Sequence, residues 1–137
     1  MASEPIRVVG LREFGRALKT LDANAPKGLR LAANDAAEFL IGRVRPLIPR
    51  RSGNAANSLT ARSTRTAVRI AIGGRKAPYY PWLDFGGRVG RNRSVVRPFI
   101  KEGRYLYPEF RRSRDEFETV LAQALTKVAE DAGMDVT

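Results

Sequence analysis

The chain has 137 residues, with 25 Lys and Arg against 14 Asp and Glu for a net charge of +11, and it contains neither Cys nor His. A disulfide scaffold, a Cys- or His-ligated metal site and imidazole acid–base catalysis are therefore excluded. The length is typical of one domain with its own core, and no apolar run approaches the roughly 18 residues of a membrane span. The N-terminus lacks the apolar region of a secretory signal, so we expect a soluble protein made in the cytosol, with no membrane partner.

The positive charge is concentrated in the middle of the chain. Residues 43–114 hold 18 Lys and Arg against 3 Asp and Glu, a net of +15, whereas residues 115–137 hold one basic and six acidic residues, a net of −5. Arg outnumbers Lys by 20 to 5, and Arg is favoured where planar contacts to carboxylates, phosphates or carbonyl oxygens are needed. A basic middle and an acidic end allow head-to-tail contact between copies. Solvated surface is an equally good explanation for any single Arg.

The first elements in chain order are an N-terminal arm over residues 1–10 and helices over residues 11–48. The N-terminal arm is expected to be irregular or a short strand. Apolar residues at helical spacing over Leu11–Leu21 predict a short first helix. A longer amphipathic helix follows and ends before Pro49, because proline disfavours a helical residue in front of it. Its apolar stripe consists of Leu29, Ala33, Ala36, Leu40, Val44 and Leu47.

A small antiparallel sheet of three to four strands is predicted over residues 56–100. Ser58–Ser63 is the expected first strand. Thr66–Gly73 is the second, because β-branched residues alternate there with smaller or charged ones. Tyr80–Phe85 is the third, in a segment that is rich in aromatic residues and interrupted by prolines. Since proline disrupts both a helix interior and a central strand, we expect this segment to be a rigid edge strand.

The rest of the chain is predicted as a loop, an edge strand and a long helix. Residues 86–94 contain three glycines and three arginines and almost no apolar anchor, which predicts an exposed, flexible loop. Val95–Ile100 is the fourth expected strand, placed at an edge by Pro98. An apolar stripe predicts a C-terminal helix over residues 108–132. The predicted fold is therefore α+β, a single domain over residues 1–137 with N-terminal helices, a small antiparallel sheet and a long C-terminal helix.

No pattern of catalytic residues is present. The glycine-rich segment lacks the spacing of a dinucleotide-binding loop, and the chain has neither a P-loop nor a nucleophile elbow. The basic middle offers only three carboxylates, those of Asp84, Glu102 and Glu109. Asp84 is more simply explained as a group held by an Arg, or by backbone amides near Gly86 and Gly87. We therefore expect no enzyme activity, no cofactor and no metal site.

Nucleic-acid binding is the alternative that the arginines leave open. Arginines on a mobile loop suit phosphate contacts, and aromatic side chains nearby suit stacking on bases. The aromatic residues are adjacent in sequence, however, so in a strand they would point to alternate faces and form no single stacking platform. Anchoring a core or an interface is the simpler role for them. The residues concerned are the cations Arg88, Arg91, Arg93 and Arg97 and the aromatics Tyr79, Tyr80 and Trp82.

Three short motifs follow one another along the chain. A long helix leads into Pro49–Leu59, which has the spacing Pro-x-x-Ser-Gly-x-x-x-x-Ser. After the predicted strand pair comes Tyr80–Gly87, Tyr-Pro-Trp-Leu-Asp-Phe-Gly-Gly, and then Arg97–Ile100, Arg-Pro-Phe-Ile. In this order, between two helical regions, the motifs resemble the neck or tail-component family of long-tailed bacteriophages, small proteins of the head–tail junction. The resemblance extends over residues 11 to about 132.

This chain departs from the family pattern at a few positions. Asp84 stands where Glu is usual, and Gly87 stands where Thr is usual. The segment that follows Phe99 reads Ile-Lys-Glu-Gly-Arg-Tyr-Leu-Tyr-Pro in place of the commoner Arg-Pro-Ala. These differences concern the local geometry of the motifs.

The resemblance implies a structural protein of the virion that is assembled in the host cytoplasm. Identical copies would form a ring, six-fold on the tail side, around the DNA channel between the head-completion ring and the tail. Its partners would be further copies, the adjacent head-completion and tail proteins, and passing DNA through non-specific contact. The expected structural or interface anchors are Trp82, Asp84, Phe85, Arg97 and Phe99. The expected contacts to a neighbouring ring or to DNA are Arg88, Arg91 and Arg93.

Overall fold

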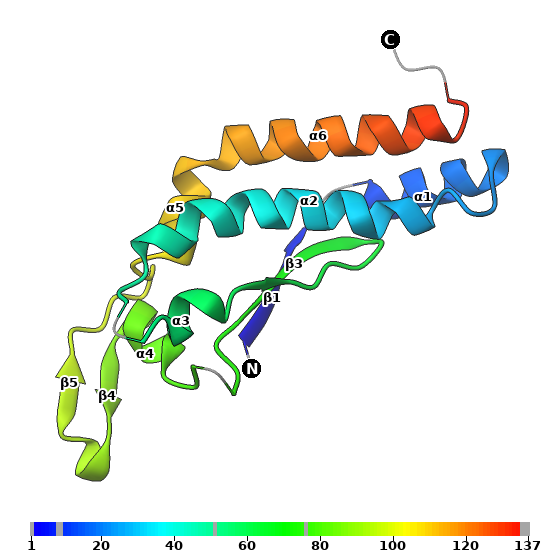
Figure 1. Cartoon of the computed structure of the whole chain (residues 1–137). Helices are drawn as coiled ribbons and strands as arrows, with labels where there is room; N and C mark the ends of the chain where they lie inside the picture. The colour runs from blue at the N-terminus through cyan, green and yellow to red at the C-terminus, as the bar shows by residue number, and fades with distance from the viewer. Residues whose placement is uncertain (1, 8–9, 51, 76, 135–137) are drawn as a thin grey trace.

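The computed structural model describes residues 2–7, 10–50, 52–75 and 77–134 and shows a mixed α+β fold. Its three long helices are α1 (Leu11–Leu21), α2 (Lys27–Val44) and α6 (Arg114–Asp131). They lie together on one side of the molecule, with α2 and α6 side by side (Figure 1). The predicted first helix is confirmed, and the second ends before Pro49 as predicted, through the 3-10 turn η1 (Arg45–Leu47).

The predicted C-terminal helix is present but bent. It consists of α5 (Leu106–Arg112) and α6, which meet at Ser113. Pro108 lies in the first turn of α5, where its missing N–H leaves no helical hydrogen bond unmade. The helical region therefore begins slightly earlier than residue 108 and changes direction once.

The main sheet has three antiparallel strands in the order β1-β3-β2. The predicted N-terminal arm supplies β1 (Ala2–Arg7), which pairs along the whole of β3 (Ala67–Ile72) from Ala2 opposite Ile72 to Arg7 opposite Ala67. The short strand β2 (Thr60–Ala61) pairs with the other edge of β3. The alternation that predicted β3 is confirmed, because Val68, Ile70 and Ile72 enter the same buried cluster as α2.

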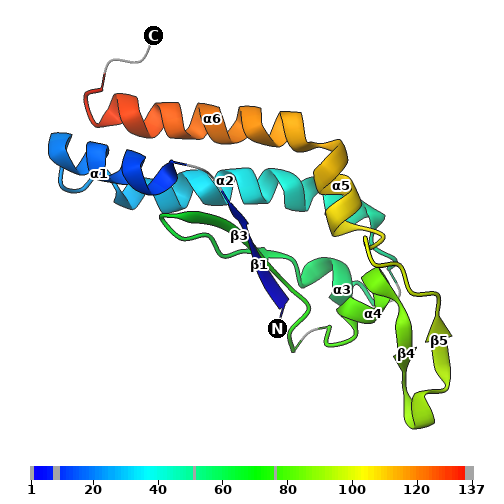
Figure 2. The same cartoon turned by 180° about the vertical axis from the view of Figure 1, so that it is seen from behind.

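One strand prediction and one loop prediction need correction. Tyr80–Phe85 is a short helix, α4, and not an edge strand. The segment predicted as a flexible loop forms β4 (Gly87–Val89) and the 3-10 turn η2 (Arg91–Arg93), and β4 pairs antiparallel with β5 (Val95–Arg97). The strand expected over Val95–Ile100 is thus confirmed in its first half, but it belongs to a separate two-stranded sheet. We call the hairpin of residues 87–97 the arm; it stands away from the rest of the molecule in both views (Figures 1 and 2).

The motif that follows Pro49 forms a compact connection into the sheet. It contains the single-turn helix α3 (Asn54–Asn57). The guanidinium of Arg45 donates to the carbonyl oxygens of Ala56 (3.1 Å) and Leu59 (3.2 Å). The buried Ser58 hydroxyl accepts the N–H of Gly73 at 3.0 Å. These bonds satisfy backbone groups that would otherwise be buried without partners.

One hydrophobic cluster joins the helices to the sheet, and a second one joins the helices to each other. The larger one packs the small and branched residues of α2 against β3 and against Phe117 and Leu121 of α6. The smaller one packs α1 against the N-terminal end of α2 and the C-terminal end of α6. Leu125 contacts both clusters. Within the ranges described, no helix is both long and apolar enough to cross a membrane.

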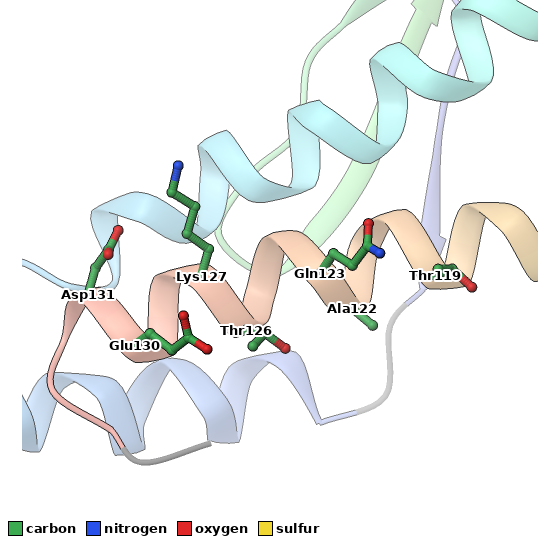
Figure 3. A pocket seen from close by; sticks show the side chains of 7 residues that line it. All are labelled: Thr119, Ala122, Gln123, Thr126, Lys127, Glu130 and Asp131. Atoms are coloured by element: carbon green, nitrogen blue, oxygen red, sulfur yellow. The ribbon is translucent and has the colours of Figure 1, made fainter. Parts of the chain in front are cut away.

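The outer face of α6 bears an open groove of about 660 Å³. Its side chains form a row along the helix at spacings of three and four residues, as Figure 3 shows. The groove ends at the turn between α1 and α2, where a second hollow shares Asp131 with it. The residues that line the groove are Thr119, Ala122, Gln123, Thr126, Lys127, Glu130 and Asp131.

Replacing Leu40 with Ala should destabilise the fold, because its side chain is 1% exposed in the larger cluster. A truncated core leucine leaves a cavity, and we expect the free energy of unfolding to fall by about 2–5 kcal/mol. Leu31→Ala is the matched control on the same helix, since Leu31 is 66% exposed, and it should change stability by no more than about 0.5 kcal/mol. Urea titration monitored by circular dichroism measures both values. Equal losses for the two variants would contradict this position of the core.

Candidate functional site

The aromatic segment forms a helix because its proline occupies the first turn. Pro81 is the second residue of α4, where the backbone N–H has no helical acceptor to lose. The carbonyl of Tyr79 accepts the N–H groups of Trp82 (3.0 Å) and Leu83 (3.2 Å). Gly86 then ends the helix with a φ of +86°. A Cβ at this position would lie 2.1 Å from the carbonyl oxygen of Pro98, so only glycine fits here.

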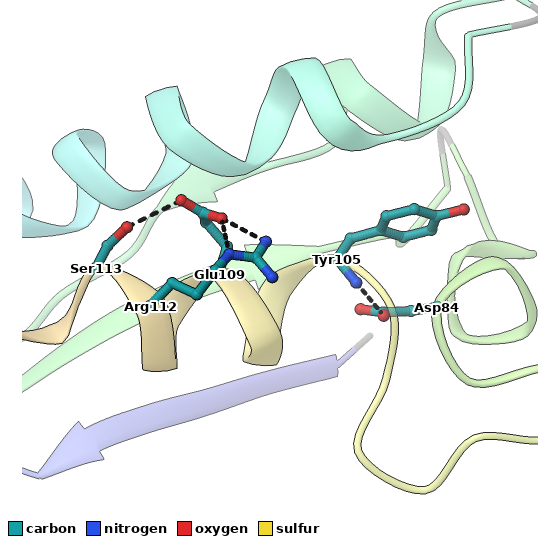
Figure 4. Close-up of polar contacts among 5 residues, drawn as sticks. All are labelled: Asp84, Tyr105, Glu109, Arg112 and Ser113. Carbon is teal, nitrogen blue, oxygen red and sulfur yellow. Dashed lines mark hydrogen bonds and ion pairs between the residues drawn. The ribbon is translucent and has the colours of Figure 1, made fainter.

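The carboxylate of Asp84 is the centre of the site (Figure 4). It is 1% exposed and is the acceptor for three donors. Oδ1 accepts the backbone N–H groups of Arg104 (2.6 Å) and Tyr105 (2.9 Å), and Oδ2 accepts the hydroxyl of Tyr80 (2.9 Å). Burial raises the pKa of Tyr80 well above its ordinary value, and the charge of Asp84 raises it further. The hydroxyl therefore stays protonated and keeps donating to the carboxylate.

The structure corrects where the partners of Asp84 come from. Backbone amides do hold its side chain, but they belong to Arg104 and Tyr105 and not to Gly86 and Gly87. An arginine also takes part, through the backbone: the guanidinium of Arg104 donates to the carbonyl oxygen of Asp84 at 3.0 Å.

The segment between the arm and α5 wraps around the end of α4. The guanidinium of Arg104 also donates to the carbonyl of Pro98. The N–H of Ile100 donates to the carbonyl of Phe85 at 2.7 Å. Gly103 adopts a φ of +78°, and a Cβ there would lie 2.9 Å from Oδ1 of Asp84. We call residues 98–105 the wrapping loop. Sequence reasoning missed Arg104 and Gly103, and the only signal that could have found them was the isolation of Asp84 among basic residues.

A stacked pair fixes the base of the arm. The indole N–H of Trp82 donates to the carbonyl of Gly87, the first residue of β4, at 3.1 Å. The guanidinium of Arg97, the last residue of β5, lies 5.6 Å from the centre of the Trp82 rings and donates to the hydroxyl of Tyr105 at 2.8 Å. A cation–π contact of this kind contributes about 0.5–2 kcal/mol, depending on burial. Both strands of the arm are therefore tied to α4.

The body of the arm is exposed. Val95 is 48% and Val96 is 59% exposed, and the side chains of Arg88 and Arg93 also lie at the surface. Asn92 has a φ of +58° and Arg93 a φ of +55° at the tip, a left-handed conformation that costs non-glycine residues about 1–2 kcal/mol each. An isolated two-stranded hairpin is at best marginally stable in water. The arm thus combines a fixed base with a strained, partly apolar and basic end.

Four of the predicted anchors come together at this base. Trp82, Asp84 and Phe85 lie on α4, and Arg97 ends the arm beside them. The Phe85 ring lies 5.9 Å from that of Tyr107 on α5. Phe99, the fifth predicted anchor, lies outside the cluster and is 71% exposed. Of the predicted contact residues, Arg88 and Arg93 are exposed on the arm, and the side chain of Arg91 lies outside the described residues.

A second polar cluster fixes the elbow that follows α5 (Figure 4). Oε2 of Glu109 accepts two hydrogen bonds from the guanidinium of Arg112, at 3.0 and 2.6 Å, and Oε1 accepts the Ser113 hydroxyl at 2.9 Å. The hydrogen bonds from Arg112 hold the pKa of Glu109 below its ordinary value, and the Ser113 hydroxyl adds to this effect. Glu109 thereby caps the bend between α5 and α6.

The geometry of the site fixes the base of the arm. The buried carboxylate has its acceptor positions turned toward three donors of its own chain. Over the ranges that the structure describes, no group of three or more acidic side chains is placed to hold a metal ion. Comparisons with protein-family models, with curated proteins and with solved structures gave no match to this chain.

Replacing Asp84 with Ala should loosen the wrapping loop. The change leaves two backbone N–H groups and the Tyr80 hydroxyl without their acceptor, and we expect a loss of about 3 kcal/mol or more in the free energy of unfolding. Asp84→Asn keeps one acceptor oxygen and should lose less. Amide hydrogen exchange at Arg104 and Tyr105 should accelerate in the Ala variant. The control is Glu102→Ala, an exposed carboxylate of the same loop; if it has an equal effect, Asp84 is not the anchor.

The elbow should make stability depend on pH through Glu109. Its pKa is lower in the folded protein than its ordinary value of 4.5. Its contribution is therefore complete well above that value and is lost as the pH falls through the folded-state pKa. We expect Glu109→Gln to be less stable than the wild type near neutral pH, and the difference to disappear as the pH falls through the folded-state pKa of Glu109. Chemical unfolding at several pH values measures this. Glu118→Gln, in an exposed ion pair, should show little difference at any pH.

Proposed function

We propose that this protein is a structural subunit of the head–tail connector of a long-tailed bacteriophage. Copies assemble into a closed ring at the head–tail junction of the virion, around the channel through which DNA passes. The ring is built in the host cytoplasm, is six-fold, and contacts the adjacent head-completion and tail proteins. The subunit performs no catalysis in this proposal and needs no cofactor.

The observation that carries the proposal is the anchored but exposed arm. The hairpin is fixed at its base by a buried carboxylate, an indole and a guanidinium, yet its valines are exposed to water. A catalytic role does not explain this combination. Contact with another protein does, because a hairpin held in its bound conformation loses little entropy on docking. Each strand of the arm also has an unpaired edge among the described residues, and such edges readily pair with another chain.

The shape of the subunit suits a ring. The arm lies at one end of the molecule, and the end of α6 lies at the other, as Figures 1 and 2 both show. A contact between these unlike ends is heterologous, and heterologous contacts generate closed rings when their rotation closes. The sequence motifs of the phage family support the same assignment. The arm now takes the intersubunit role that the sequence had suggested for an edge strand at Tyr80–Phe85.

A basic nucleic-acid-binding module is the second candidate. Residues 87–97 contain four arginines and no carboxylate, and a two-stranded β-ribbon has the width to enter the major groove of DNA. Such binding should weaken steeply as salt is raised. The exposed Val95, Val96 and Phe99 favour a protein partner over this alternative.

The proposal predicts that the purified full chain forms rings at high concentration. Analytical ultracentrifugation should show a closed oligomer, and negative-stain electron microscopy should show rings with a central opening. In a phage lysate the protein should co-purify with tails or with joined particles. A monomer at every concentration, with no place in the virion, would reject the proposal. Salt-sensitive DNA binding by that monomer would favour the second candidate.

Charging the apolar residues of the arm should prevent assembly without unfolding the subunit. We expect Val95→Glu combined with Val96→Glu to weaken ring formation at least tenfold, because the exposed valines no longer gain by burial. The matched control is Leu31→Glu, since Leu31 on α2 has a similar exposure and lies outside the arm. Sedimentation velocity measures assembly, and thermal unfolding checks that each variant is folded. Rings of normal stability from the double variant would remove the arm from the interface.

A further inference from the structure

We propose that the arm of one subunit docks into the groove on α6 of the next subunit, with Arg88 and Arg93 meeting Glu130 and Asp131. The partner is a second copy of this chain. The inference rests on the proposed ring and names the surface that receives the arm. It assigns a role to the groove on α6, which the cluster around Asp84 leaves unused.

The charges of α6 single out its C-terminal end as the receiving surface. Near its start, Glu116 is paired with Arg43 of α2, and Glu118 is paired with Arg114. Asp115, also exposed near the start of α6, does not line the groove. Glu130 and Asp131, by contrast, are exposed, and their side chains make no hydrogen bond or ion pair with any other described residue. Their carboxylates therefore remain available to an outside cation.

Other features of the groove fit a basic, partly apolar arm. The helix dipole adds negative potential at the C-terminal end of α6, where an incoming guanidinium is favoured. Asp22, in the adjoining hollow, adds a third carboxylate. The three carboxylates outnumber Lys127, the one cation among the residues that line the two hollows. Towards the middle of the helix the lining becomes small, with Ala122 and Thr126. Small side chains there leave room for the valines of β5.

The arm supplies the complementary groups. Arg88 lies on β4 directly opposite Val96 on β5, so a cation and an apolar side chain stand together across the hairpin. Arg93 lies at the tip. The side chains of Arg88 and Arg93 make no hydrogen bond or ion pair with another residue that the structure describes. The strained left-handed backbone of the tip is acceptable if it presents Arg93 to a partner.

The arm of a subunit lies far from the groove of the same subunit. The arm and the C-terminal end of α6 lie at opposite ends of the molecule in both views (Figures 1 and 2). Both surfaces therefore remain open in a single copy, and each can be satisfied by a different neighbour. This head-to-tail arrangement repeats from copy to copy until the ring closes.

The test reverses the charge on each side separately and then mixes the products. The arm-reversed protein carries Arg88→Glu and Arg93→Glu, and the groove-reversed protein carries Glu130→Lys and Asp131→Lys. Alone, each protein opposes like charges at every interface, and we expect ring formation to weaken tenfold or more. In an equimolar mixture every arm meets a groove of opposite sign, so rings should return with the two proteins alternating. Native mass spectrometry should then find equal numbers of both in each ring.

Matched controls reverse the same number of charges elsewhere. Arg62→Glu with Arg65→Glu alters exposed arginines in the turn before β3, and Asp35→Lys with Glu38→Lys alters exposed carboxylates on α2. Both should assemble like the wild type. Because Arg93 has a positive φ, Arg88→Glu alone serves as a second arm variant whose backbone is unstrained, and it should show a smaller loss of the same kind. Thermal unfolding confirms that each protein is folded.

The outcomes separate this inference from the proposed function. If the wild type forms no ring, the proposed function fails and this inference fails with it. If the wild type forms rings but either reversed protein still assembles, or the mixture does not recover, the ring stands and the α6 groove is not its receptor. Loss of DNA binding in an arm-reversed protein whose rings are intact would assign the arm to nucleic acid and overturn the inference.

Discussion

The buried carboxylate of Asp84 is the constraint on which the rest of the molecule depends. A charge in this position is tolerable only if every lone pair that faces the interior meets a donor. The donors come from two places, Tyr80 one turn earlier in α4 and the backbone of Arg104 and Tyr105 twenty residues later. The requirement therefore closes the chain on itself at this point. Residues 85–103, which include the arm, therefore form a loop whose two ends meet at the same carboxylate.

This closure explains why the arm is both exposed and well positioned. Its first residue is held by the indole of Trp82 and its last residue by stacking on the same ring, so the hairpin leaves the body in a defined direction. A free hairpin of this length would lose much of its docking energy to ordering. Here part of that ordering is already supplied by folding. The strain at Asn92 and Arg93 is then confined to the tip, the part farthest from the anchors.

Sequence patterns predicted what depends on local periodicity and failed where a distant segment decides. The stripes of α1 and α2 and the alternation of β3 predict these elements correctly. The predicted burial fails at the ends of the stripes, where Leu21 and Leu47 are exposed, and β3 is buried on both faces, since Ala71 is buried as well. Pro78 and Pro81 argue against a helix and so predict a strand over Tyr80–Phe85, although Pro81 falls in the first turn of α4, which tolerates proline. Asp84 stands out in the sequence as a lone carboxylate among arginines, but the sequence suggests the backbone amides near Gly86 and Gly87 as its partners. No local pattern points to Arg104, because that contact exists only once the wrapping loop has folded back.

The distribution of ion pairs gives the subunit its polarity. Three carboxylates near the elbow are paired within the chain. Glu116 pairs with Arg43 of α2, and Glu109 and Glu118 pair with arginines of their own helices. The arm carries four arginines and no carboxylate of its own, while Glu130 and Asp131, the carboxylates that line the groove, lie at the opposite end of the molecule. Folding alone cannot bring these two sets together. In the proposed assembly, a second copy in the same orientation offers the matching charge to each of these ends. An open row of subunits in that proposal would leave one arm and one groove unoccupied at its ends, and closure into a ring would occupy both.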